Sequence, residues 1–322
     1  MKKLTSIILL LQLSMGVWAQ KNEVNFRVAK FKDDKACAIS YTFDDDLQEH
    51  YTLVFPYFEK LGIKGTFFIN GATIEESQGV HEVRGVVRTT WAQLKEMADH
   101  GHEIANHGWA HKNFNRFPFE EIKEDICKND SAIEKNIGKP ALTFCYPNNS
   151  KNKEGVAYVS KGRVGTRTFQ ISIGSKRDSA FLSNWIDTLI INQEWGVGMT
   201  HGITHGYDAF KDPQVFWNHL EEVKSREAQI WVATFADISA YTKEAENTNL
   251  RTEVKGKQWI ITPDLDLKEA IFNQPLTMVV EALDIKKVVA NQDGKALLVK
   301  LEKDKACFEF NPYGGEIVVK IK

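Results

Sequence analysis

Three adjacent carboxylates, Asp44, Asp45 and Asp46, follow an apolar run that extends from Ala36 to Phe43. Adjacent carboxylates repel one another, so a site that keeps them ionised needs a cation, a hydrogen-bond network or open solvent. Solvent is the usual environment of acidic residues at a turn. The triplet alone therefore leaves open a ligand site and an ordinary solvated turn.

Two histidines further along the chain favour a metal. His107 and His111 stand four positions apart, and on a helical turn they would share one face. Two imidazoles at this spacing can bind one metal, and one carboxylate from elsewhere would complete a three-ligand set with an open position. Such an open set is typical of catalytic sites. Two polar surface histidines are the alternative explanation of the spacing.

Three segments carry a family resemblance: Thr42–Asp45, Gly101–Ile104 and His107–His111. They resemble the first two motifs of the polysaccharide deacetylases, the family-four carbohydrate esterases with a NodB-homology domain. The likeness continues through Leu61–Ile69 and Trp91–Gly101 and covers roughly residues 25–241.

The resemblance implies a role for each residue of the first two motifs. Asp45, His107 and His111 would bind a divalent metal, and Asp44 would be the general base that takes a proton from water. Zinc suits two imidazoles and a carboxylate, with Co²⁺, Ni²⁺ or Mn²⁺ as alternatives.

Two later residues match the family pattern. The resemblance implies that His201, directly after the apolar run ending at Thr200, protonates the leaving nitrogen. His205 is a rival, but it stands in the following loop, where surface histidines are common. Tyr146 would supply the backbone N–H of an oxyanion site.

The chain departs from the family in its third and fourth motifs. The stretch Phe144–Asn148 lacks the arginine that holds the catalytic aspartate in the family, and Arg163 or Arg167 could replace it. The fourth motif, an aspartate with a tryptophan, has only Asp178 and Trp185 as candidates. Both could equally be surface or core residues.

Further residues have two interpretations each. Asp46 stands where the family usually has glycine, and we expect it either to point outwards or to touch substrate hydroxyls. Trp185, Trp195 and Tyr207 could stack on sugar rings, but large aromatic side chains more often belong to the core. We expect His102 to be a hydrogen-bonded core histidine.

The fold prediction comes from short apolar runs that alternate with helical patterns, which indicates a parallel sheet or barrel. The candidate residues follow the C-terminal ends of these runs, and parallel barrels place their active sites on that rim. The resemblance implies an α/β fold with an irregular parallel (β/α) barrel of fewer than eight strands. The predicted strands are residues 36–43, 65–70, 102–106, 141–146, 163–169, 197–200 and 230–235.

The pattern changes after Tyr241 to short alternating strands, with a hairpin signal at Asp293–Gly294. We predict three parts: a signal peptide over residues 1–20, a deacetylase barrel over 21–245 and an accessory β-sandwich over 246–322. The sandwich either covers an apolar edge of the barrel or binds glycan.

The signal peptide predicts an exported protein, periplasmic or extracellular, without an integral membrane span. Without Lys2 and Lys3, the remaining chain has 39 basic and 43 acidic residues, a net charge of −4. This balance argues against nucleic acid as a partner. Of the four cysteines, Cys37 and Cys145 could form a bridge if their strands are neighbours, and buried free thiols are the alternative.

The predicted function is a metal-dependent hydrolase that removes N-acetyl groups from an amino-sugar polysaccharide or oligosaccharide, such as chitooligosaccharide or peptidoglycan. One alternative is an O-acetyl esterase on xylan or another acetylated glycan, since the same residues serve an ester. The other is a non-catalytic glycan-binding protein on a decayed deacetylase scaffold, suggested by the altered third and fourth motifs.

Overall fold

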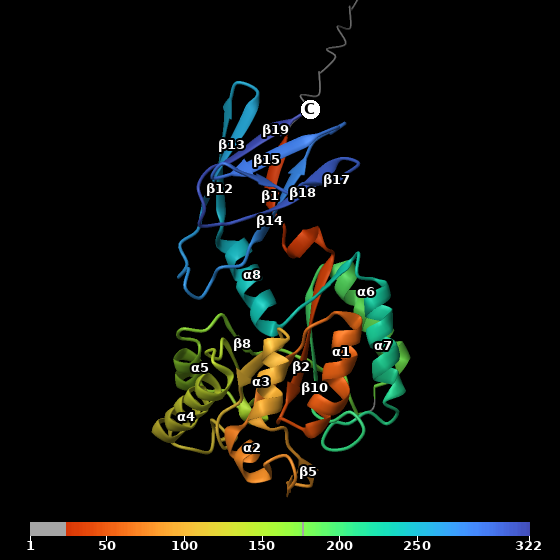
Figure 1. The fold of residues 1–322 in the computed structure, drawn as a ribbon, viewed down its shortest axis with the longest axis vertical. Helices are drawn as coiled ribbons and strands as arrows, with labels where there is room; N and C mark the ends of the chain where they lie inside the picture. Colours follow the sequence, from red (N-terminus) through yellow and green to blue (C-terminus); the bar gives the residue numbers. More distant parts are fainter. Residues whose placement is uncertain (1–23, 176) are drawn as a thin grey trace, which may run out of the picture.

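The computed structural model describes residues 24–175 and 177–322, so the predicted signal peptide lies outside the described residues. A helical and parallel-stranded barrel is joined to a β-sandwich (Figure 1). Among the described residues, no helix combines the length and apolar character needed to cross a membrane.

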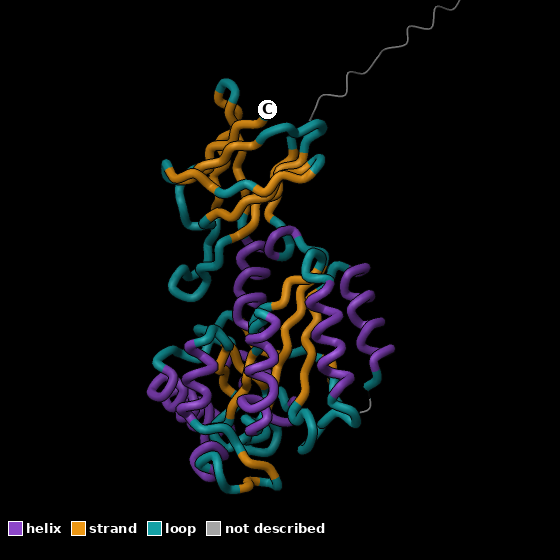
Figure 2. The backbone as a smooth tube through the Cα atoms, turned by 45° about the vertical axis from the view of Figure 1, so that its right-hand side comes forward, coloured by secondary structure: helices purple, strands orange, loops and turns teal. Residues whose placement is uncertain are grey.

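The barrel is built on one curled parallel sheet, with helices on its outer side (Figure 2). Its strands run in the order β8-β7-β6-β3-β2-β10-β9, and β11 also pairs with β2. This confirms the predicted α/β fold. The strands are β2 (Cys37–Asp44), β3 (Thr66–Ile69), β6 (Glu103–Asn106), β7 (Thr143–Cys145), β8 (Gly165–Arg167), β9 (Ile171–Ser172), β10 (Trp195–Thr200) and β11 (Ile230–Val232).

The sheet contains eight strands, whereas we expected fewer than eight. The difference arises at one edge of β2. There β3 pairs with residues 42–44 and β11 pairs with residues 37–39, so the two strands share a single edge. The curl itself follows a path of seven strands.

Local sequence signals define the ends of several helices. Thr90 and Gln93 form a capping box at the start of α3, and Gly62 and Gly138 end α1 and α4 in the left-handed conformation. The isoleucines of α4 form its buried stripe. The helices of the barrel are α1 (Phe55–Leu61), α2 (Gly71–Ser77), α3 (Trp91–Asp99), α4 (Phe119–Ile137), α5 (Lys153–Val159), α6 (Ser179–Asn192), α7 (Gln214–Ser225) and α8 (Phe235–Asn247).

The sandwich consists of two antiparallel sheets, with the orders β1-β14-β18-β17 and β12-β13-β19-β15-β16. Their facing apolar side chains form a core of their own. The predicted hairpin at Asp293–Gly294 joins β15 and β16. The strands are β1 (Asn25–Val28), β12 (Asn249–Lys255), β13 (Gln258–Asp264), β14 (Leu276–Glu281), β15 (Val288–Gln292), β16 (Lys295–Leu297), β17 (Lys300–Glu302), β18 (Lys305–Phe310) and β19 (Ile317–Ile321).

One strand lies outside a simple division of the chain at residue 245. β1 precedes the barrel in sequence but pairs with β14 of the sandwich. Helix α8 provides the other connection, because Tyr241 packs into the sandwich core and its hydroxyl donates to the Ala29 carbonyl. The sandwich lies at the end of the barrel where β2 begins (Figure 1).

All four cysteines are free thiols. Cys37 begins β2 and Cys145 ends β7, so the two lie at opposite ends of a parallel sheet. The bridge that we considered between them is therefore not formed.

Candidate active site

A cavity of about 490 Å³ opens at the C-terminal ends of the barrel strands. It collects the predicted catalytic and metal-binding residues from β2, β7, β8, β10 and the loop after β6. This agrees with the expectation that such residues gather on the rim of a parallel barrel. The lining residues are Asp44, Asp45, Arg84, His107, His111, Tyr146, Asn148, Asn149, Arg167, Gln170, Met199, His201 and Tyr207.

Asp45, His107 and His111 form a cluster with the shape of a metal site. Asp45 Oδ1 lies 3.6 Å from Nε2 of His107 and 3.7 Å from Nε2 of His111. This oxygen is buried and has no hydrogen-bond partner among the described residues, which is costly unless a cation binds it. The three residues therefore fit a divalent metal.

A carbonyl group orients one of the two imidazoles. Nδ1 of His107 donates to the Cys145 carbonyl at 2.9 Å, so its Nε2 faces the cluster. Burial, with the neighbouring His107, lowers the pKa of His111 below its usual value, although Asp45 opposes this. The His111 imidazole is thus suited to act as a neutral ligand.

The expectation that the histidines share a helical face is wrong. Residues 107–111 form an irregular loop after β6, in which Gly108 and His111 have φ values of 77° and 56°. Asp125 of α4 fixes this loop, because its carboxylate accepts from the Ala110 N–H and its carbonyl accepts from the Trp109 N–H. The turn brings the two rings to a centroid distance of 4.7 Å.

Arg167 holds the Asp44 carboxylate, as we expected of an arginine that replaces the missing third-motif arginine. Its two terminal nitrogens donate to the two oxygens of Asp44, at 2.7 and 2.5 Å. Both side chains are almost fully buried. Burial alone would raise the pKa of Asp44, but the Arg167 guanidinium holds it well below its usual range. Asp44 is consequently ionised at neutral pH.

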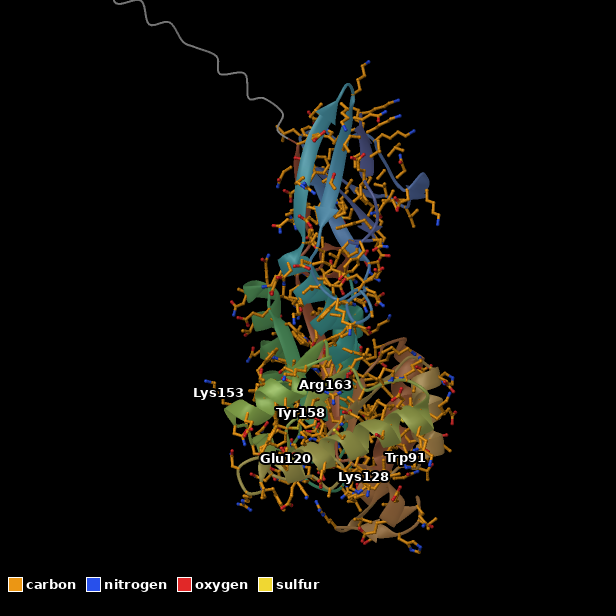
Figure 3. All side chains as sticks on the ribbon, turned by 90° about the vertical axis from the view of Figure 1, so that its left-hand side faces the viewer. Trp91, Glu120, Lys128, Lys153, Tyr158 and Arg163 are labelled. Atoms are coloured by element: carbon orange, nitrogen blue, oxygen red, sulfur yellow. The ribbon has the colours of Figure 1, made fainter. Side chains whose placement is uncertain are left out.

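Arg163, the other candidate for this role, does not contact Asp44. It precedes β8, so it lies at the opposite end of that strand from Arg167, and it binds Asp130 and the Ala141 carbonyl. Figure 3 shows Arg163 near Tyr158 on the flank of the barrel that carries α4 and α5.

His201 lies on the far side of the cluster, with Nε2 4.0 Å from Asp45 Oδ2. Two residues at the start of η2 (His50–Val54) hold the loop that carries His201. Nε2 of His50 donates to the His201 carbonyl, and the carboxylate of Glu49, directly before η2, accepts from the Thr204 N–H. The rival His205 is exposed and pairs with Glu49 outside the cavity. Only His201 faces the cluster.

Tyr146 lies directly after β7 at the cavity wall. Its side chain is buried, and its hydroxyl donates to Oγ1 of Thr166 at 3.0 Å. The side chain is therefore engaged in the core, which leaves the backbone as the part of Tyr146 that could serve the cavity.

Asp46 behaves differently from both of our expectations. It is fully buried, and its carboxylate accepts from the Asn70 N–H and the Thr73 hydroxyl, each at 3.0 Å. It neither points to solvent nor lines the cavity. Asp46 instead ties the end of β2 to the start of α2.

Sequence reasoning missed Arg88, a buried arginine that supports Asp45. One of its terminal nitrogens donates to the Asp45 carbonyl, and the other donates to the Val83 carbonyl at 3.0 Å. Asp45 has a φ of 69°, which L-residues rarely adopt. The available signal was an arginine directly after two valines, but it belongs to no motif.

Of the residues considered for the fourth motif and for stacking on sugar rings, one lines the cavity and the others do not. Asp178 caps α6 by accepting from the Phe181 N–H, and Trp185 stacks on His219, so neither lines the cavity. Trp195 packs against Phe235 in the core. Tyr207 alone of these lines the cavity, largely exposed and edge-on to His201.

Comparison with known proteins agrees with this geometry. Residues 32–163 match the model of the family described as polysaccharide deacetylase. Over this segment the chain is similar to the polysaccharide deacetylases. The match includes Asp44, Asp45, His107, His111 and Tyr146, whereas Arg167 and His201 lie beyond it.

Two curated relatives of the chain are peptidoglycan deacetylases by their names. The peptidoglycan-N-acetylglucosamine deacetylase PgdA of Listeria monocytogenes is 25% identical over 128 residues, which are 39% of this chain and 24% of that protein. The peptidoglycan-N-acetylmuramic acid deacetylase PdaA of Bacillus subtilis is 25% identical over 135 residues, 42% of this chain and 46% of that protein. The chain spans less than half the length of either relative.

A solved structure shares the fold. A Mycobacterium smegmatis protein described as a polysaccharide deacetylase superposes with a TM-score of 0.53 at 15% identity. The match covers 71% of this chain and 97% of that protein. At this identity the likeness concerns the fold alone.

Proposed function

We propose that the protein is a divalent-metal-dependent hydrolase that removes N-acetyl groups from an amino-sugar polysaccharide or oligosaccharide outside the cytoplasm. One observation carries the proposal: an ionised, arginine-held Asp44 lies beside the Asp45–His107–His111 cluster in one cavity, with His201 facing that cluster. The two peptidoglycan deacetylases among the relatives support an amino-sugar substrate.

Asp45, His107 and His111 would hold the metal, most suitably Zn²⁺. When bound, this ion supplies a Lewis acid for the acetyl carbonyl and makes water more acidic. The remaining steps belong to the chain. Asp44 accepts a proton from the attacking water, and the water oxygen forms the new bond to the acetyl carbon.

His201 then donates a proton to the amide nitrogen as its bond to the acetyl carbon breaks. The products are acetate and a free amine on the sugar. The Tyr146 N–H is our candidate for stabilising the negative charge that develops on the carbonyl oxygen. Arg167 keeps Asp44 ionised and fixes the direction of its two oxygens, so it is a positioning residue.

The ion pair with Arg167 has a consequence for the base. Because the arginine stabilises the carboxylate, Asp44 is a weak base on its own. Asp44 alone would therefore take a proton from ordinary water poorly.

Acetate release by the zinc-loaded protein tests this function, using N-acetyl chitooligosaccharides, peptidoglycan and acetylated xylan. We expect release from an amino-sugar substrate and loss of that release in Asp44→Asn. Release from xylan alone would replace the amide substrate with an ester. The absence of release from all three, with metal bound, would contradict the proposal.

A further inference from the structure

The mouth of the cavity carries a positively charged side chain, Arg84, that has no role in the proposed chemistry. Two arginines line the cavity, and Arg167 is committed to Asp44. Arg84 is exposed and forms no ion pair or hydrogen bond with any side chain in the described part of the chain. Exposed arginines are common on protein surfaces. The case for a role of Arg84 therefore depends on where it lies and on its backbone conformation.

Arg84 occupies an unfavourable backbone position. It forms, with Gly85, the two-residue turn between β4 (Glu82–Val83) and β5 (Val86–Val87), and the two φ values are 56° and 79°. Turns of this type favour asparagine, aspartate or glycine at the first position, because other side chains crowd the backbone. Strain that is retained beside a functional cavity suggests a role for the side chain.

The hairpin that carries Arg84 is fixed to the active site. Val83 and Val86 are buried, and Arg88 links the Val83 carbonyl to the Asp45 carbonyl. The hairpin lies beside α2, at the end of the barrel away from the sandwich (Figure 1). The buried side chain of Arg88 thus connects the hairpin of Arg84 to Asp45 of the Asp45–His107–His111 cluster.

The remaining rim supplies hydrogen-bonding groups without charge. Asn148, Asn149 and Gln170 line the same cavity, and Nε2 of Gln170 donates to Oδ1 of Asn149 at 2.7 Å. The two lining acids are already engaged, Asp44 by Arg167 and Asp45 within the histidine cluster. Arg84 therefore offers a substrate a positive charge that no acidic side chain of the lining neutralises.

We propose that Arg84 binds a carboxylate on the acetylated sugar, so that the preferred substrate is an acidic amino-sugar chain. This inference rests on the proposed function. One unpaired guanidinium matches one singly charged carboxylate, to which it can donate two parallel hydrogen bonds. The neutral amides of the rim suit the sugar hydroxyls.

The test uses two disaccharides that differ in charge at one group: N-acetylglucosaminyl-N-acetylmuramic acid and the same compound with its carboxylate converted to the neutral methyl amide. The variants are Arg84→Gln, which removes the charge, and Arg84→Asn, which removes it with a residue that suits the turn. Arg116→Gln is the control, because Arg116 is exposed but does not line the cavity.

We expect the parent protein to prefer the acid over the amide by about 10-fold in kcat/KM, mainly through KM. Arg84→Gln and Arg84→Asn should abolish this preference, and Arg116→Gln should retain it. Equal turnover of acid and amide by the parent would overturn the inference, while the proposed deacetylase function would stand.

A binding measurement separates the two proposals if no acetate is released. Titration of metal-free protein with both disaccharides should show the same charge preference, again dependent on Arg84. Binding with this preference but without turnover would support the inference and contradict the proposed function. Binding without a preference for the acid would overturn the inference.

Discussion

Arg167 and Asp44 form a buried two-point ion pair although they are 123 residues apart in the chain. The aspartate ends β2, and the arginine ends β8 at the far edge of the same sheet path. The curl of the sheet brings the two strand ends together across the cavity. A parallel sheet that was flat would hold them apart.

Removing the arginine should therefore affect both activity and stability. Arg167→Ala leaves a buried carboxylate without its partner, and we expect the free energy of unfolding to fall by about 3–5 kcal/mol. Acetate release should fall by about 100-fold or more. Urea unfolding and kinetics on the same samples measure both effects. Arg163→Ala is the control, and an equal loss of activity in that variant would argue against a specific role for Arg167.

The second prediction concerns metal binding. His111→Ala should greatly weaken zinc binding, measured by titration calorimetry, because it removes one of three ligands. Zinc at 100 times its Kd should stabilise the parent protein against unfolding by about 2.7 kcal/mol. His205→Ala should bind zinc like the parent. Undiminished zinc binding by His111→Ala would exclude this ligand set.

The third prediction compares the two histidines of one loop. His201→Ala should reduce kcat by about 10²–10⁴-fold, because it removes the proton donor of the leaving nitrogen. His205→Ala should change kcat by less than about threefold, since His205 is exposed and contacts Glu49 outside the cavity. A larger loss in His205→Ala would exchange the roles that we assign to the two residues.

Arg88 is predicted to act through Asp45. Arg88→Met keeps the apolar stem but removes the donors to the Asp45 and Val83 carbonyls, so zinc affinity should fall by about 10-fold to 100-fold. Calorimetric titration with zinc measures this directly. Unchanged affinity would show that Asp45 keeps its orientation without the arginine.

Glu244 is expected to make stability depend on pH. Burial raises the pKa of Glu244 to about 7, against the hydrogen bond from the Gln274 N–H. A raised carboxyl pKa means that the folded state binds the proton more tightly. The stabilisation from Glu244 is thus present below about pH 4.5, its unfolded value, and is lost as pH rises through 7.

The variant Glu244→Gln should remove this contribution. Denaturant unfolding from pH 5 to 8 should show a smaller decline for the variant than for the parent. Burial also raises the pKa of Glu103 to about 7, but Glu103 is present in both proteins, so their difference isolates Glu244. Parallel curves for the two proteins would contradict the prediction.

Much of this site could be predicted because its residues follow recognisable strands. Asp44, His107 and His201 each come directly after an apolar run, and parallel strands bring such positions to one rim. For the partner of Asp44, the sequence left two candidates, Arg163 and Arg167, four positions apart. Only the strand bounds, which place Arg163 before β8 and Arg167 at its end, distinguish them.

Other features depend on contacts that no local pattern encodes. The histidine pair suggested a helix by its spacing, but Asp125 of α4 holds the segment in a loop. Asp46 appeared to be a surface acid because its partners, Asn70 and Thr73, come from a later turn. Arg88 and Arg84 belong to a hairpin of two-residue strands, which is too short for periodicity to detect.

The pairing of β1 with β14 affects how the molecule can be assembled. Asn25 and Glu281 bind each other across 256 positions, so the whole barrel is enclosed between two neighbouring strands of the sandwich. During synthesis β1 leaves the ribosome before the barrel, and its partner strand β14 follows only after the barrel has been synthesised. The sandwich must therefore be the last part to close, and cutting the gene at residue 245 would release a barrel with an exposed strand attached to its leading end.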